Sequence, residues 1–264
     1  IGDIEQIPVI AGDVDYIFHT VSITASKMMV QHPVLTIQTS YMGTKNVLDL
    51  AVDKKIEGMV YVSSMEVYGP DEKKEYITEK DLGYIELENV RSSYSEGKRI
   101  CECLCNAYTA EFGLPVKSAR LAQTFGAGVL QEDNRVYAQF ARSAMKKENL
   151  VLRTDGSSEG NYCYTRDVIR ALLLLGYSGK VGEAYNVVNE KSHMTIREMA
   201  ELVANDVSNG EIKVEFDIPD EAKSLGYAPK VKMHLSSEKL NKLGWKAEVD
   251  MKEAYLRMMN DMEA

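Results

Sequence analysis

The sequence predicts an α/β fold built on a parallel sheet, because short apolar runs alternate with long helical patterns. Residues 15–21 and 58–62 form continuous apolar runs bounded by Gly and Asp turn signals. Such runs are typical of strands that are buried on both faces. Two long helical patterns, 33–54 and 92–112, alternate with them.

The helical patterns have recognisable faces and ends. Segment 92–112 is followed by Gly113 and Pro115, which stop a helix, and 116–121 is expected to be the next strand. An apolar stripe at helical spacing marks segment 33–54; its members are Val34, Ile37, Tyr41, Leu48 and Ala51.

The second half of the chain predicts a smaller α/β unit. We expect an amphipathic helix at 136–147 and a strand at 150–153 with a turn at 155–156. Apolar residues then fall at every second position, as in a half-buried strand. These residues are Ile212, Val214, Phe216 and Ile218.

Composition limits the possible functions. With 264 residues the chain can bury a sizeable core in one or two domains, and its net charge of −9 argues against nucleic-acid binding. No apolar run approaches the roughly 18–20 residues of a membrane span, so we expect a cytoplasmic protein with no membrane partner. Cys101, Cys103 and Cys105 do not share one helix face, so we expect reduced packing cysteines and no metal site.

Three residues suggest a proton relay. Ser64 ends the apolar run 58–62, while Tyr94 and Lys98 are four residues apart and share one face of the predicted helix. A lysine ammonium beside a phenol favours the phenolate and is expected to lower the pKa of Tyr94. Tyr94 would then exchange a proton with a substrate oxygen that Ser64 also contacts.

These residues resemble a known family. Ser64 precedes Met-Glu-Val-Tyr-Gly, and Tyr94-x-x-x-Lys98 follows thirty residues later. The combination is similar to extended short-chain dehydrogenases/reductases, in particular the NAD-dependent nucleotide-sugar epimerases and dehydratases. The resemblance implies a doubly wound, Rossmann-like sheet, NAD as cofactor, a nucleotide-sugar substrate and a homodimer through helices 33–54 and 92–112. It also implies a strand at 184–188, a helix at 195–200 and a closing helix from 250.

The resemblance implies contacts with the cofactor along the whole dinucleotide. Asp3 and Ile4 match the pair beside the adenine ring, and His19 matches a residue under the pyrophosphate, although a structural core histidine is an equal alternative. The implied cofactor-binding residues are Asp3, Ile4, His19, Thr20, Val21, Ser40, Tyr94, Lys98 and Leu121.

One expected cofactor element does not occur in the sequence. There is no strand–glycine–helix turn to hold a pyrophosphate on a helix N-terminus. The chain also begins with Ile1 rather than Met. We therefore expect a sheet that lacks its first strands, in a fragment missing roughly the first 60–70 residues of a family member. The alternative function is a catalytically silent fragment or degenerate scaffold, with the strand at 16–21 as an exposed apolar edge.

Substrate binding departs from the family pattern at one position. Gly160 stands where the family carries an Arg that holds the nucleotide phosphate, and Gly cannot make bidentate contacts. Arg153 or Arg166 would have to replace it, and Gln123 stands where an Asn usually contacts the sugar. The implied substrate-binding residues are Ser64, Met65, Gln123, Arg153 and Arg166.

Glu66 is the residue that discriminates between reactions. The family's dehydratases carry an Asp-Glu pair where this chain has Met65-Glu66, and a thioether cannot donate a proton. Glu66 alone resembles the nucleotide-sugar decarboxylases, although a carboxylate that caps the turn is an alternative. The expected function is epimerase/dehydratase chemistry by transient oxidation with Tyr94 as base. Within this class, the alternative is 4,6-dehydration or decarboxylation rather than 4-epimerisation. The implied catalytic residues are Ser64, Glu66, Tyr94 and Lys98.

The resemblance also divides the chain into two domains. Residues 1–125, with 162–190 returning to them, are expected to form the dinucleotide-binding domain. Residues 126–161 and 191–264 are expected to form the smaller substrate-binding domain.

Overall fold

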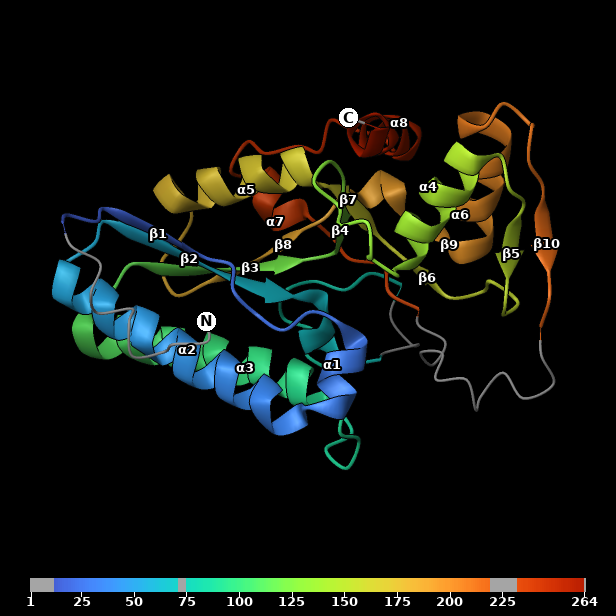
Figure 1. Ribbon diagram of the computed structural model, residues 1–264. Coiled ribbons are helices and arrows are strands. Elements are labelled where there is room, and N and C mark those ends of the chain that lie inside the picture. Colours follow the sequence, from blue (N-terminus) through green and yellow to red (C-terminus); the bar gives the residue numbers. More distant parts are fainter. Residues whose placement is uncertain (1–11, 71–74, 219–231, 264) are drawn as a thin grey trace.

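A parallel sheet with helices on both faces forms the centre of the molecule. The computed structural model describes residues 12–70, 75–218 and 232–263. The sheet has the order β1-β2-β3-β8. Helices α2 and α3 cover one face and α5 the other (Figure 1), which confirms the predicted α/β fold. The bounds are β1 (Tyr16–His19), α1 (Ser26–Gln31), α2 (Pro33–Lys54), β2 (Gly58–Ser64), α3 (Ser92–Phe112), β3 (Val116–Leu121), α5 (Thr165–Tyr177) and β8 (Ala184–Val187).

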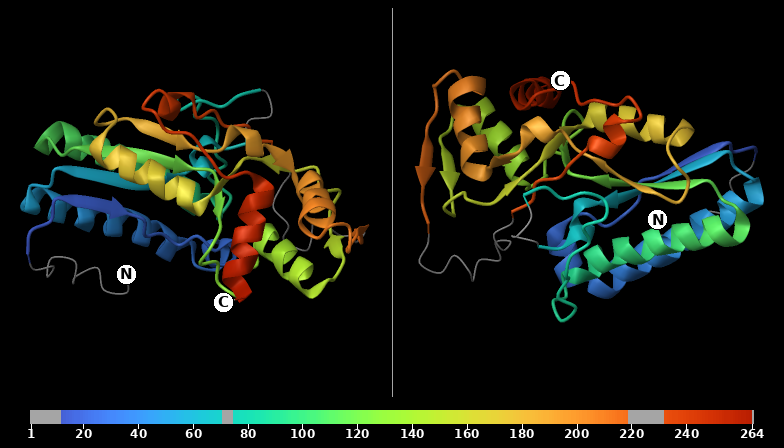
Figure 2. Two further views of the ribbon diagram at one scale, coloured as in Figure 1. Left: turned by 90° about the horizontal axis from the view of Figure 1, so that it is seen from above. Right: turned by 180° about the vertical axis from the view of Figure 1, so that it is seen from behind.

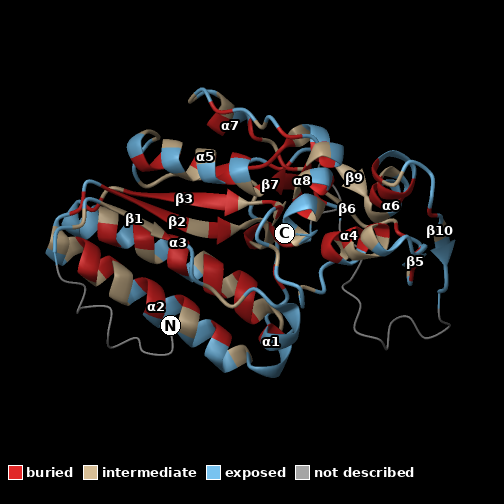
Figure 3. Cartoon of the chain, turned by 45° about the horizontal axis from the view of Figure 1, so that its top comes forward, coloured by how far each residue is buried: buried red, intermediate tan, exposed pale blue. Residues whose placement is uncertain are grey.

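Strand β2 is buried on both faces, as its continuous apolar sequence predicts. Met59 and Tyr61 pack with the apolar sides of α2 and α3. Val60 points the other way and packs with Ala171 of α5, because successive side chains of a strand alternate. Figure 3 shows the buried strands between helices whose outer faces are exposed.

A second lobe lies at the end of the sheet toward which the strands point (Figure 2). Its core is formed mainly by α4, α6, the π-helical turn η4 and α8. Short pairs of strands, β4 with β7, β5 with β10 and β6 with β9, complete it. The bounds are β4 (Gln123–Phe125), α4 (Val136–Lys146), β5 (Leu150–Leu152), β6 (Glu159–Gly160), β7 (Tyr162–Tyr164), β9 (Met194–Thr195), α6 (Ile196–Leu202), η4 (Val203–Val207), β10 (Val214–Phe216) and α8 (Met251–Glu263).

Two expectations for this half of the chain need correction. The alternating segment 212–218 forms a strand only over Val214–Phe216, and Phe216 and Ile218 are exposed although Ile212 is buried. The reason is that β10 pairs only with the three-residue β5 in the described structure, at the edge of the lobe. Leu240 and Trp245 pack with Val187 in the core of the central sheet, so their segment leaves the lobe to which residues 191–264 were assigned.

A buried carboxylate holds this returning segment. Asp167 of α5 is fully buried, and its Oδ2 accepts the backbone N–H groups of Glu248 and Val249 at 2.8 and 2.9 Å. Trp245 donates its indole N–H to the Asp167 carbonyl at 3.0 Å. The negative charge is balanced by Arg170, 3.3 Å away. The closing helix α8 is therefore tethered to the first turn of α5.

The two edges of the central sheet differ. On β8, the Asn186 N–H donates to the Glu79 carboxylate at 2.8 Å, and the Lys239 ammonium donates to the Ala184 carbonyl at 2.6 Å. Polar contacts of this kind disfavour pairing with another strand. At the other edge β1 pairs with β2 alone among the described residues.

The cysteines and the helices agree with the composition. Cys101 and Cys105 are buried thiols, and Cys103 between them is exposed, as the helical spacing predicts. No helix within the described ranges is long and apolar enough to cross a membrane.

Candidate active site

Ser64, Tyr94 and Lys98, which we call the Ser–Tyr–Lys set, lie at the carboxyl end of the sheet. Ser64 is the last residue of β2 and stands opposite Leu121, the last residue of β3. A 3₁₀ turn, η2 (Met65–Tyr68), follows at once, and the Ser64 hydroxyl accepts the Glu66 N–H at 3.2 Å. Ligands of open parallel sheets bind at such carboxyl ends.

Tyr94 is buried beside Ser64, with 7% of its surface exposed. Burial raises the pKa of the Tyr94 phenol; a hydrogen bond with Ser64 lowers that pKa, the Glu66 charge raises it and the Arg91 guanidinium lowers it. Burial prevails, because a phenolate loses its hydration in an apolar environment.

Lys98 is buried below the Tyr94 ring. Its ammonium lies 5.8 Å from the centre of the Tyr94 ring and donates to the Val62 carbonyl of β2 at 2.8 Å. Only 2% of Lys98 is exposed, and this burial lowers the pKa of the ammonium to about 8. The cation that lowers the pKa of Tyr94 here is Arg91, and the role of Lys98 toward the phenol stays a prediction.

Glu66 is held by an arginine that the sequence reading missed. Arg91 donates Nη1 to Glu66 Oε2 at 2.6 Å and Nη2 to Oε1 at 2.9 Å. The Ser95 hydroxyl adds a third hydrogen bond to Oε2 at 3.2 Å. Glu66 therefore does more than cap its turn, since its carboxylate is fixed beside the Ser–Tyr–Lys set. In the sequence, Arg91 lies four residues before Ser95, about one helical turn away, so both can reach the same carboxylate.

His19 ends β1 next to the set. The ring Nε2 lies 3.0 Å from the Thr44 hydroxyl of α2, a partner that the sequence reading also missed. Burial, with the Lys98 charge, lowers the pKa of His19 to about 4, so the ring is neutral at physiological pH. Thr20 and Val21 follow at the carboxyl end of the strand and are exposed, as cofactor-contacting residues must be before binding.

Several buried side-chain groups lack a hydrogen-bond partner among the described residues, among them the hydroxyls of Ser63 in β2 and Ser93 in α3, each next to a member of the set in the sequence. Such orphaned groups are rare in proteins. Unpartnered groups also occur in the second lobe, for example at Tyr137 and Tyr255, so they do not by themselves mark a ligand site. Asp3 and Ile4, assigned to the adenine end, lie outside the described residues.

Ser40 lies between α2 and α3. Its hydroxyl donates to the Thr36 carbonyl at 2.9 Å inside α2, and the residue is buried. A Cβ at Gly97 of α3 would stand 3.2 Å from this hydroxyl, so the glycine permits α2 and α3 to approach closely. The contact of Ser40 with a cofactor stays a prediction.

The residues assigned to the substrate are divided between two places. Gln123 begins β4, directly after β3, and Met65 follows Ser64, so both lie at the carboxyl end of the sheet. Arg166 instead pairs with Glu248 at 2.9 Å, and Arg153 pairs with Asp217 beyond β5. No contact in the described structure joins either arginine to the set. Their ion pairs therefore do not identify either one as the phosphate-binding residue expected in place of Gly160.

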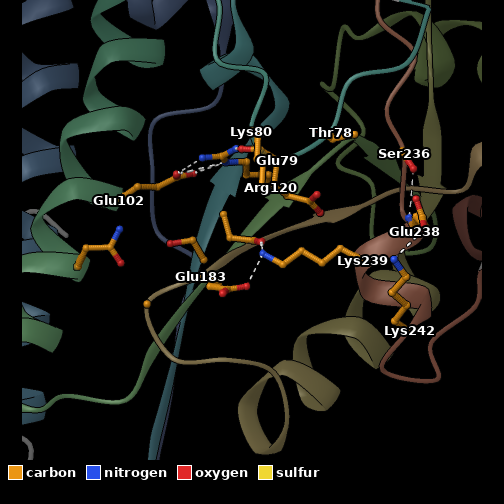
Figure 4. Close-up of a pocket in the computed structure, with 14 residues that line it drawn as sticks. Thr78, Glu79, Lys80, Glu102, Arg120, Glu183, Ser236, Glu238, Lys239 and Lys242 are labelled. Carbon is orange, nitrogen blue, oxygen red and sulfur yellow. Dashed lines mark hydrogen bonds and ion pairs between the residues drawn. The ribbon is translucent and has the colours of Figure 1, made fainter.

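A cavity of about 700 Å³ lies apart from the set, at the β8 edge between α3 and α7 (Glu238–Asn241) (Figure 4). The set does not line it. Its charges are largely neutralised within the wall, which leaves little to recognise a charged ligand. The ion pairs are Arg120 with Glu102 at 2.6 Å, Lys239 with Glu183 at 2.8 Å and Lys242 with Glu238 at 2.7 Å.

Comparisons with known proteins agree with this geometry. The profile described as "NAD dependent epimerase/dehydratase family" matches residues 2–188. UDP-glucuronic acid decarboxylase 6 of Arabidopsis thaliana is 30% identical over 251 residues, which cover 94% of this chain and 70% of that protein. UDP-glucuronic acid decarboxylase 1 of Danio rerio is 31% identical over 198 residues, 75% of this chain and 46% of that protein.

Two solved structures share the fold. The UDP-glucose 4-epimerase of Thermotoga maritima, determined with UDP-glucose, superposes with a TM-score of 0.86 at 20% identity and covers 99% of this chain and 82% of that one. The structure of RMD from Pseudomonas aeruginosa, complexed with NADPH, superposes with a TM-score of 0.80 at 27% identity, over 94% of this chain and 81% of that one.

Proposed function

Because the chain belongs to the NAD-dependent epimerase/dehydratase family, we propose that it converts a nucleotide sugar by transient oxidation of a sugar hydroxyl. Tyr94 is the base in this proposal, NAD the cofactor, and decarboxylation of a UDP-linked uronic acid the reaction. The observation that carries it is the Ser–Tyr–Lys set at the carboxyl end of the sheet, with the Glu66 carboxylate held by Arg91 next to it.

Each residue of the set has a defined task. NAD, when bound, would supply a reversible hydride acceptor for the sugar carbon. Tyr94 accepts the proton of the sugar hydroxyl, and Ser64 hydrogen-bonds the same oxygen as it becomes a carbonyl. Lys98 and neutral His19 line the nicotinamide side, where Lys98 can exchange its bond to the Val62 carbonyl for one to a ribose hydroxyl.

Decarboxylation suits the residues better than dehydration does. Oxidation next to the carbon that bears the carboxylate creates a β-keto acid, whose C–C bond breaks as CO₂ leaves and its electrons pass to the ketone. This step requires no acid for a leaving hydroxyl. Met65 cannot supply such an acid, so 4,6-dehydration, the second candidate, lacks a proton donor there. The curated relatives named above act, by their names, on UDP-glucuronic acid.

The test is turnover of UDP-glucuronic acid. Purified protein with NAD is mixed with UDP-glucuronic acid, UDP-glucose and dTDP-glucose in parallel, and products and CO₂ are measured. We expect CO₂ release from the uronic acid alone, reduced at least about a hundredfold in Tyr94→Phe, which keeps the ring. Unchanged turnover in that variant would refute the role of Tyr94. Failure to bind NAD or to turn over any sugar would favour the scaffold alternative.

We also propose the homodimer through α2 and α3. Val34, Ile37 and Tyr41 share one face of α2 and are exposed, as is Ile100 of α3, and apolar faces of this kind mark association surfaces. Sedimentation should show a dimer, and Ile37→Glu should weaken it at least about tenfold. Leu173→Glu, an exposed apolar residue on α5, is the control that leaves the dimer intact; a monomeric wild type would contradict the proposal.

The two-domain division stays part of this proposal. The separate cores around the sheet and within the second lobe support it. In this division the first domain carries the cofactor and the second, 126–161 with 191–264, completes the nucleotide-sugar site. The segment with Leu240 and Trp245 is the exception, because it packs on the sheet. The cytoplasmic location remains a prediction.

A further inference from the structure

We propose that Arg91 is a positioning residue of this site, which clamps the Glu66 carboxylate beside Ser64 and Tyr94 and neutralises it there. This inference rests on the proposed function for its effect on turnover, but its geometry and its first test do not. The proposal concerns how the charge next to the reacting phenol is fixed.

The clamp is bidentate. The two terminal nitrogens of Arg91 each donate to a different oxygen of Glu66, at 2.6 and 2.9 Å. Paired contacts of this kind fix orientation as well as distance, because the planar guanidinium matches the carboxylate fork. About 30% of the Arg91 side chain and 27% of the Glu66 side chain are exposed, so the pair is only partly screened by water.

Arg91 is itself held in place. Its backbone N–H donates to the Asn89 side-chain oxygen at 3.0 Å, and its Nη2 lies 3.4 Å from the Ser26 hydroxyl of α1. It also occupies the N-cap of α3, three residues before Tyr94. The Arg91 backbone is thus held by Asn89 and its guanidinium contacts Ser26, and Arg91 directly precedes the helix that carries Tyr94.

The charges around Tyr94 show how the Arg91–Glu66 pair affects the phenol. The groups that face the phenol are Ser64 of β2, Glu66 of η2, and Arg91 and Lys98 of α3. Glu66 alone would disfavour the phenolate, and Arg91 opposes it. Since the Lys98 ammonium donates to the Val62 carbonyl, Arg91 is the cation that offsets Glu66. Pairing therefore keeps a carboxylate available beside the substrate without blocking deprotonation of Tyr94.

The first test follows the ionisation of Tyr94 without any turnover. Protein labelled with ¹³C at the tyrosine ζ carbon is titrated by NMR, and the Tyr94 signal is identified by its loss in Tyr94→Phe. Arg91→Met should move the Tyr94 titration to higher pH, Glu66→Gln to lower pH, and the double variant back toward the wild type. Arg257→Met, which removes a similar Arg–Glu pair on α8, should leave it unchanged. No movement in Arg91→Met, or the same movement in Arg257→Met, overturns the proposal.

The second test uses the reaction itself. With UDP-glucuronic acid, Arg91→Met should lower kcat about ten- to a hundredfold, since a displaced carboxylate misaligns the site, while KM changes less. Arg91→Lys keeps the charge but loses the fork, so it should recover part of kcat and most of the Tyr94 titration. A change confined to KM would overturn a positioning role. Absence of turnover in the wild type, with the titrations as expected, would instead refute the proposed reaction alone.

Discussion

Lys98 is expected to destabilise the folded protein at neutral pH. Its ammonium is 2% exposed, and burial lowers its pKa from 10.5 to about 8. A difference of about 2.5 in pKa corresponds to about 3 kcal/mol, at 1.36 kcal/mol for each unit. Replacement by Met, which has a similar shape, removes this cost but leaves the Val62 carbonyl without its donor, a loss of about 1 kcal/mol. Lys98→Met should therefore be about 2 kcal/mol more stable than the wild type at pH 7.

The pH dependence distinguishes this cause from better packing. Between the folded pKa of about 8 and the unfolded value near 10.5, the unfolded chain binds more protons at Lys98 than the folded chain does. The stability of the wild type therefore rises with pH through this window. The advantage of Lys98→Met should shrink from pH 8 upward, vanish near pH 10 and reverse above it, because the loss of about 1 kcal/mol at the Val62 carbonyl remains.

Urea unfolding of both proteins at pH 7 and pH 10 measures the two differences. Lys252→Met, which changes an exposed lysine on α8, is the control and should alter neither. The reasoning fails if Lys98→Met is less stable than the wild type at pH 7, or if its advantage is the same at both pH values. If the advantage appears while turnover is lost, Lys98 is retained for function at the expense of stability.

Three further outcomes follow from single residues. Asp167→Asn should cost about 3 kcal/mol in urea unfolding, because the buried carboxylate accepts two backbone N–H groups and pairs with an arginine. The wild type should lose up to about 3 kcal/mol as pH falls from 6.5 to 4, since burial lowers the pKa of His19 to about 4 and only the unfolded chain takes up that proton; His19→Gln should lack this loss. Gly69→Ala should cost at least about 2 kcal/mol, because a Cβ there would stand 2.2 Å from the Tyr84 carbonyl oxygen, whereas Gly113→Ala, with a similar φ and open space, should cost about 1 kcal/mol.

Periodicity was enough to find the strands of the sheet and to place Tyr94 and Lys98 on one side of a helix. The apolar run before Ser64 and the four-residue spacing of Tyr94 and Lys98 depend on local geometry, which the sequence records directly. The partners of those residues depend on segments that meet only in the fold. Thr44 reaches His19 across 25 positions and Arg91 reaches Glu66 across 25, and no local pattern encodes such a meeting.

Burial is the part of the electrostatics that spacing does not give. The four-residue spacing places Tyr94 and Lys98 on one side of α3, but it does not say how deeply that side is buried or what else the ammonium contacts. Both depend on where β2 lies beneath the helix. The same limit applies to the segment 212–218, whose alternation is that of a half-buried strand although its pairing partner is only three residues long.

The two edges of the central sheet would respond differently to an added strand. On β8 such a strand would have to displace the contact of Glu79 with the Asn186 N–H and that of Lys239 with the Ala184 carbonyl. At the opposite edge, β1 pairs with β2 alone among the described residues and ends at His19. A strand that joined β1 would therefore lie beside His19, whose pKa already responds to the charge of Lys98.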